Sequence, residues 1–134
     1  MSPADRGRVA ALDLGEVRIG VAVSDTGGVL ASPLDVIPSG DLSGYLRGLV
    51  DEQGVCEVVV GVPRTLGGEV GFQARKVLSR LDALKTEFPG VRFVKWDERF
   101  TTRLAASRGR RKGRVDHLAA ARMLQEYLEA RENL

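Results

Sequence analysis

The sequence has 134 residues, a length typical of one compact domain that can bury a hydrophobic core without disulfides or structural metal. Its hydrophobic fraction of 43% is ordinary for a globular protein, and its net charge of +2 excludes a chain that is basic throughout. No segment is long and apolar enough to span a membrane, and residues 1–8 lack the apolar stretch of a signal peptide. The single cysteine, Cys56, excludes a disulfide framework and a Cys/His zinc site and favours the reducing cytoplasm.

The first third of the chain predicts three short strands in an antiparallel meander. Residues 1–7 are expected to be a disordered lead-in. The β-rich runs are residues 8–14, 17–25 and 29–37. Gly15-Glu16 between the first two favours a tight hairpin, and Gly27-Gly28 signals the next turn. Pro33 lacks a backbone N–H, so the third run is expected to be an edge or irregular strand.

The remainder alternates helices with strands. Asp41 is a candidate N-cap for a helix that ends at Gly54, and Pro89-Gly90 ends the next helix. Apolar stripes at helical spacing define these two helices, the first with Leu42, Tyr45, Leu46, Leu49 and Val50, the second with Val70, Ala74, Val77, Leu78, Leu81, Leu84 and Phe88. Strands are expected at residues 57–62 and 91–96. Cys56, inside the same apolar run as the first of these, is expected to be buried.

The C-terminal third adds a short helical segment that begins at Thr101-Thr102 and a last helix over residues 115–131. The order β-β-β-α-β-α-β-α-α predicts an α/β fold in one domain over residues 1–134. Its mixed five-stranded sheet would combine the three-strand antiparallel meander with parallel strands, flanked by helices.

Carboxylates stand where solvated surface charges are not normally found. Asp13 lies at the end of an otherwise apolar strand, where it requires a cation; a salt bridge to Arg18 or Arg99 and a metal ion explain it equally well. Asp97 and Glu98 follow the strand at 91–96, and ligands bind beyond the carboxyl ends of parallel strands. Because side chains alternate along a strand, only one of these two acids is expected to point toward that edge. The other could cap the helix that follows, a role that suits Asp97 better than Glu98.

Asp116 begins the last helix on the side of its apolar stripe, whereas a plain N-cap need not point inward. Three acids at one sheet edge would repel one another, and a divalent cation relieves that repulsion. Hard oxygen ligands select Mg²⁺ or Mn²⁺ over zinc, so Asp13, Glu98 and Asp116 are predicted as metal ligands and catalytic residues for phosphodiester hydrolysis.

A basic run lies between the Thr101 segment and Asp116. It contains Arg108, Arg110, Arg111, Lys112 and Arg114, with glycines between them. Such a run suits phosphate neutralisation, although by itself it fits a solvated loop better.

Taken together, the motifs of this sequence resemble those of the YqgF family of RNase H-like nucleases, described as Holliday-junction resolvases and as pre-16S rRNA processing nucleases. The matching blocks, which cover nearly the whole chain in order, are residues 13–15, 18–25, 60–63 with 67–68, 97–102, and Asp116 with 119–121, 124–125 and 127–128. The resemblance implies an RNase H-like fold, the acids Asp13, Glu98 and Asp116, and a cytoplasmic role in maturing the 5′ end of 16S rRNA. Glu16, His117 and Arg64-Thr65-Leu66 depart from the family pattern, which bears on substrate preference.

The expected function is therefore metal-dependent hydrolysis of nucleic acid by a monomer or homodimer. Arg18 and Arg99 would hold phosphate through their guanidinium groups, with Thr101, Thr102 and the basic run (Arg110, Arg111, Lys112, Arg114) also binding substrate. Structured RNA is the expected substrate and branched DNA the alternative. A nucleotide-binding module and a non-cleaving rRNA-binding protein are further alternatives; the first lacks a second phosphate loop, and the second has no use for an acidic cluster.

Neutralising three arginines of the basic run tests its role in binding. The triple variant Arg108→Gln/Arg110→Gln/Arg111→Gln should keep the fold and the metal site but weaken RNA binding. The salt dependence should flatten by close to one phosphate contact per residue removed. Fluorescence anisotropy across a salt series measures this, and an unchanged slope with normal affinity would mean that the RNA path lies elsewhere.

Overall fold

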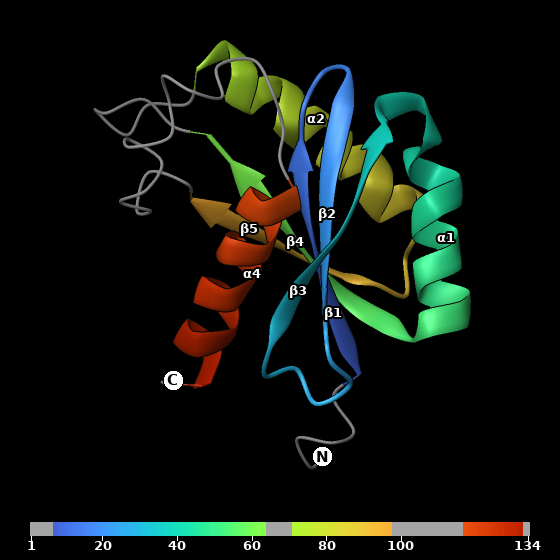
Figure 1. The fold of residues 1–134 in the computed structure, drawn as a ribbon. Helices are drawn as coiled ribbons and strands as arrows, with labels where there is room; N and C mark the ends of the chain where they lie inside the picture. Colours follow the sequence, from blue (N-terminus) through green and yellow to red (C-terminus); the bar gives the residue numbers. More distant parts are fainter. Residues whose placement is uncertain (1–6, 64–70, 98–116, 133–134) are drawn as a thin grey trace.

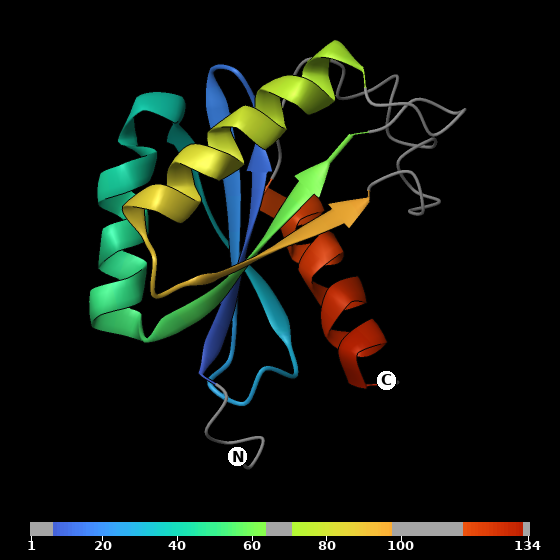
Figure 2. The same ribbon diagram turned by 180° about the vertical axis from the view of Figure 1, so that it is seen from behind.

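The sheet and its helices are seen in the computed structural model, which describes residues 7–63, 71–97 and 117–132. The elements are β1 (Arg8–Leu14), β2 (Arg18–Ser24), β3 (Ala31–Pro38), η2 (Ser39–Asp41), α1 (Leu42–Gln53), β4 (Val55–Val62), α2 (Phe72–Glu87), β5 (Arg92–Asp97) and α4 (His117–Glu132). Five strands form one sheet in the order β3-β2-β1-β4-β5. Helices α1 and α2 cover one face and α4 covers the other (Figures 1 and 2). The predicted mixed α/β sheet is confirmed.

Strand β1 lies at the centre of the sheet. It pairs antiparallel with β2 and parallel with β4, and β5 continues the parallel part. The predicted meander is therefore confirmed, as is the edge position of the third strand. Pro33 lies in β3 opposite Ala22, next to a register irregularity between Val21 and Ala22. An edge strand can accommodate the missing proline N–H because its outer side has no ladder to complete.

Alternation along the strands divides the core into two layers. Leu12, Ile19 and Val60 face α1 and α2, whereas Ala11, Ala22 and Val59 face α4. The predicted helical stripes supply the other side of the contacts. Their buried members are Leu42, Leu46, Leu49, Ala74, Val77, Leu81, Leu84 and Phe88 toward the first layer, and Ala120, Met123, Leu124, Tyr127 and Leu128 toward the second. No helix within the described ranges is long and apolar enough to cross a membrane.

The helix ends follow the sequence signals with one difference. Gly54 closes α1 in the left-handed conformation (φ 73°), and α2 ends just before Phe88-Pro89. Asp41 occupies the predicted N-cap position of α1, but its side chain makes no capping hydrogen bond. Because Asp41 is the last residue of the 3-10 turn η2, its backbone (φ −95°, ψ 2°) is not extended as in a capping residue. The segment expected to begin at Thr101 and residues 115–116 of the last helix lie outside the described residues.

The expectation that Cys56 is buried is wrong: its side chain is exposed. The parallel register shifts at this point, since Arg8 pairs with Val55 and Val9 pairs with Glu57. Cys56 is therefore the extra residue of a bulge, which turns its side chain away from the two core layers. Its thiol lies 3.7 Å from the Arg8 carbonyl oxygen.

The same irregularity buries a charge. Glu57 is 8% exposed, and its carboxylate accepts a hydrogen bond from the Tyr127 hydroxyl (2.9 Å) and an ion-paired one from Arg131 Nη1 (3.0 Å). Arg131 Nη2 also donates to the Gly28 carbonyl oxygen, and Tyr127 meets the Trp96 ring edge-on at 5.9 Å. Burial and then the Glu57 hydrogen bond raise the pKa of the Tyr127 hydroxyl. These contacts fix the C-terminal part of α4 to the sheet.

Removing one partner of the buried pair should destabilise the fold. In Arg131→Met, Glu57 would keep its Tyr127 hydrogen bond and lose the less exposed of the two cations that pair with it among the described residues, Arg131 being 18% exposed. We expect a loss of about 2–3 kcal/mol in the free energy of unfolding, measured by urea titration with circular dichroism. Arg92→Met is the matched control, because Arg92 approaches the same carboxylate (3.3 Å) from a side chain that is 78% exposed and should cost less than about 1 kcal/mol. Equal losses in the two variants would contradict this assignment.

Candidate active-site edge

The carboxyl ends of three strands meet at one edge of the sheet. Asp13 is the last but one residue of β1, and β5 ends at Asp97, which pairs with Val62 at the end of β4. Because β1, β4 and β5 are parallel, their ends lie together, which is where ligands bind in sheets of this kind. The structure therefore places Asp13 at the predicted edge.

Asp13 is half-buried and lies on the α4 side of the sheet. Its neighbours along β1, Leu12 and Leu14, belong to the layer under α1 and α2, so alternation turns Asp13 to the opposite face. Its partner on β2 is Gly20, and on β4 Gly61 follows the residue that pairs with Leu12. Neither glycine projects a side chain over Asp13.

Arg18 begins β2 at the same edge and is exposed. It lies two residues before Gly20, and alternation therefore places it on the α4 side with Asp13. The structure thus brings one predicted acid and one predicted phosphate ligand to the same face of the same edge.

The other predicted site residues lie outside the described ranges. They are Glu98, Arg99, Thr101, Thr102, Arg110, Arg111, Lys112, Arg114 and Asp116. Their roles remain predictions. His117, which departs from the family pattern, is the first residue of α4 and is partly buried. Within residues 7–63, 71–97 and 117–132, no group of three His, Cys, Asp or Glu side chains is placed to hold a metal ion.

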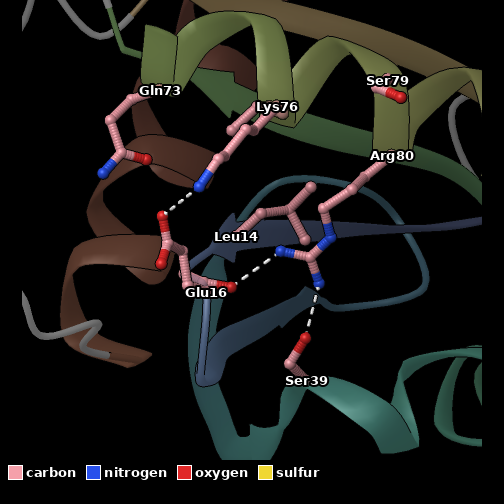
Figure 3. A pocket seen from close by; sticks show the side chains of 9 residues that line it. Leu14, Glu16, Ser39, Gln73, Lys76, Ser79 and Arg80 are labelled. Atoms are coloured by element: carbon pink, nitrogen blue, oxygen red, sulfur yellow. Dashed lines mark hydrogen bonds and ion pairs between the residues drawn. The ribbon is translucent and has the colours of Figure 1, made fainter.

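A pocket of about 440 Å³ opens on the other face of this edge, between the β1–β2 turn (residues 15–17) and α2. We call it the hairpin pocket. It is lined by Leu14, Gly15, Glu16, Ser39, Gln73, Lys76, Val77, Ser79 and Arg80. Figure 3 shows Lys76 and Arg80 extending from α2 toward the turn.

Arg80 fastens the turn to α2. Its Nη1 donates to the Gly15 carbonyl oxygen at 2.7 Å and its Nη2 to Ser39 Oγ at 3.0 Å (Figure 3). The turn is also closed by backbone bonds, from Gly15 N to the Arg18 oxygen (3.0 Å) and from Ser39 N to the Val17 oxygen (2.8 Å). Burial lowers the pKa of the Arg80 guanidinium, as expected for a cation that is drawn partly out of water.

Lys76 lies one helical turn before Arg80. Its Nζ is 2.8 Å from Glu16 Oε1, and both side chains are substantially exposed. The hydrogen bond from Lys76, and then its charge, lower the pKa of the Glu16 carboxyl. The same Nζ lies 4.5 Å from the centre of the Phe72 ring, which is 65% exposed at the start of α2.

The hairpin pocket was not predicted from the sequence. The apolar stripe of residues 70–88 predicts the helix and its buried face, but it gives no information about the opposite, polar face. Gln73, Lys76 and Arg80, at positions i, i+3 and i+7 of a helix, share a face and are the signal that could have indicated it.

Comparison with known proteins gives consistent results. The family model RuvX, described as Holliday junction resolvase, matches residues 7–130. A protein of Rubrobacter xylanophilus named "Putative pre-16S rRNA nuclease" is 64% identical over 135 residues, covering 96% of each chain. A Thermus thermophilus protein of the same name is 40% identical over 132 residues, covering 90% of this chain and 96% of its own.

Solved structures agree on the fold. The T. thermophilus RuvC protein in complex with a Holliday junction substrate superposes with a TM-score of 0.59 at 18% identity, covering 95% of this chain and 96% of that chain. A second T. thermophilus RuvC structure gives a TM-score of 0.57. This likeness establishes the RNase H-like fold.

Removing the Arg80 side chain should loosen the β1–β2 turn. In Arg80→Met we expect faster amide hydrogen exchange at Gly15 and Ser39 and a loss of about 1–2 kcal/mol of stability, because two charged hydrogen bonds disappear. Arg75→Met, on the exposed face of the same helix, is the matched control and should change neither quantity. Protection at Gly15 and Ser39 that is unchanged in Arg80→Met would show that the backbone bonds alone hold the turn.

Proposed function

The chain belongs to the RuvX family, a nuclease family described as Holliday junction resolvases, and from this premise we propose that it is a metal-dependent nuclease that acts on structured RNA in the cytoplasm. The resemblance drawn from its sequence motifs is thereby confirmed. We further propose that its role is to mature the 5′ end of pre-16S rRNA, as the names of its relatives suggest, and that the whole chain acts as one RNase H-like domain.

One observation supports the nuclease site above others: Asp13 stands half-buried at the end of the central strand, with glycines in place of neighbouring side chains. Partial burial favours a positively charged neighbour for a carboxylate, and a metal ion can take that role. Its place at the carboxyl ends of parallel strands supports a ligand site there.

Two further carboxylates complete the proposed donor set. Glu98 is the next residue after β5, which ends at the Asp13 edge, and Asp116 immediately precedes α4, which covers the Asp13 face. Carboxylate oxygens are the donors that Mg²⁺ and Mn²⁺ prefer, so this set fits either ion.

Asp13, Glu98 and Asp116 would hold the metal ion. When bound, Mg²⁺ or Mn²⁺ would supply an activated water and neutralise charge on the phosphate. The protein's remaining task is to orient the nucleic acid. Arg18, exposed beside Asp13, would bind a phosphate oxygen through its guanidinium fork, and Arg99 would do the same. Thr101, Thr102 and the basic run would hold the flanking strand.

Branched DNA is the second candidate substrate. It is favoured by the description of the family and by the likeness to RuvC, whose structure holds a Holliday junction. A resolvase cuts two strands symmetrically and so requires a two-fold dimer. Parallel assays on a four-way junction and on a precursor rRNA fragment separate the two candidates, and symmetric paired nicks with intact RNA would reverse the ranking.

Asp13→Asn tests the metal site, because it preserves the shape of the side chain and removes its charge. We expect the cleavage rate of structured RNA in Mn²⁺ to fall about 100-fold or more and the affinity for Mn²⁺ to drop. Asp51→Asn, an exposed acid on α1, is the control and should match the unmodified protein in both measurements. Equal cleavage rates for Asp13→Asn and the unmodified protein would show that the site is misassigned.

A further inference from the structure

We propose that the hairpin pocket binds a phosphate of the nucleic acid strand flanking the cut, with a neighbouring base stacked on Phe72, whose ring adjoins Lys76 of the pocket. This inference rests on the proposed function, since the ligand is the same nucleic acid. The subsite is defined by Arg80 and Lys76 of α2, which extend toward the β1–β2 turn, and by Phe72, whose ring lies next to Lys76.

The charge of Arg80 points to an anion. This guanidinium lines the pocket and is only partly exposed, yet its two described acceptors, the Gly15 carbonyl and the Ser39 hydroxyl, are both neutral. Among the described residues no carboxylate forms an ion pair with it. A guanidinium has five N–H donors, so two bonds to the turn leave others for a ligand. A fixed cation with free donors suits a phosphate oxygen.

Lys76 supplies a second, exchangeable cation. In the structure it pairs with Glu16 of the β1–β2 turn, with Nζ 2.8 Å from Oε1. Both partners are exposed, so this pair is weak and an incoming phosphate can replace the Glu16 carboxylate. Glu16 thus acts as an internal competitor at the mouth of the pocket.

Phe72 supplies an apolar contact next to these cations. Its ring is 65% exposed and lies 4.5 Å from Lys76 Nζ, so a base stacked on the ring has its own phosphates within reach of the lysine. Stacking on aromatic rings beside a cationic groove is a common way to bind single strands without regard to sequence.

The position relative to Asp13 explains why the subsite would flank the cut. Leu14 lines the hairpin pocket, whereas Asp13, the preceding residue, faces the α4 side. A strand that passes over the end of β1 therefore meets the carboxylate on one face and the cations on the other.

The test measures binding without cleavage, by fluorescence anisotropy of a labelled single-stranded RNA in EDTA across a salt series. Lys76→Gln should weaken binding about fivefold at 0.1 M salt and reduce the salt slope by about 0.7, the loss of one phosphate contact. Phe72→Ala should weaken it about tenfold. Lys85→Gln, an exposed lysine at the far end of α2, should change nothing. Glu16→Gln should tighten binding, and this gain should vanish in the Lys76→Gln background.

Affinity and slope unchanged in both Lys76→Gln and Phe72→Ala would overturn the proposal. Titration with inorganic phosphate, followed by the NMR signals of Gly15 and Ser39, distinguishes a strand phosphate from a free anion. If phosphate shifts these signals while Lys76→Gln leaves the affinity for RNA unchanged, the pocket binds a small free anion and the strand subsite is refuted. RNA that binds with the expected variant effects but is never cleaved would refute the nuclease function and leave the subsite standing.

Discussion

The position of β1, hydrogen-bonded on both sides, governs the rest of the structure. An antiparallel partner on one side and a parallel partner on the other bring the β1–β2 turn and the carboxyl ends of β4 and β5 to a single edge. Because β1 has a strand on each side and helices over both faces, its side chains from Val9 to Leu12 are buried, and all of them are apolar. Burial decreases at the carboxyl end of β1, where Asp13 lies. The location of the candidate site is thus a consequence of sheet order.

The α4 face adds a second constraint, because apolar packing along the helix does not by itself fix where α4 lies along the sheet. Ala120 and Leu124 pack onto the sheet, and the Glu57–Arg131 pair holds the far end of the helix. A buried pair contributes modest net stability but strongly disfavours arrangements in which either charge is left alone. The pair therefore sets where α4 lies along the sheet, and so how the helix meets the Asp13 edge.

The sequence predicts those features that depend on local chemistry. The edge position of Pro33 and the left-handed conformation of Gly54 follow from the backbone restrictions of proline and glycine. The buried faces of α1 and α2 follow from the helical spacing of their apolar residues. Cys56 and Glu57 could not be placed, because a bulge between two strands distant in sequence decides which face each side chain takes. Asp13 was identified because an acid at the end of an apolar strand is anomalous by itself. Arg80 was missed because its acceptor, the Gly15 carbonyl, is 65 residues away and carries no sequence signal.

Strand alternation separates opposite charges at the β1–β2 turn. Asp13 faces α4, while Arg80 is tied to the Gly15 carbonyl on the other face and is thus held away from the carboxylate. The sheet therefore keeps this acid and this base from pairing with each other, and each faces a different side of the same edge. A nucleic acid strand bound as proposed would pass over the end of β1, with its phosphates next to Arg80 on one face and the proposed metal site on the other.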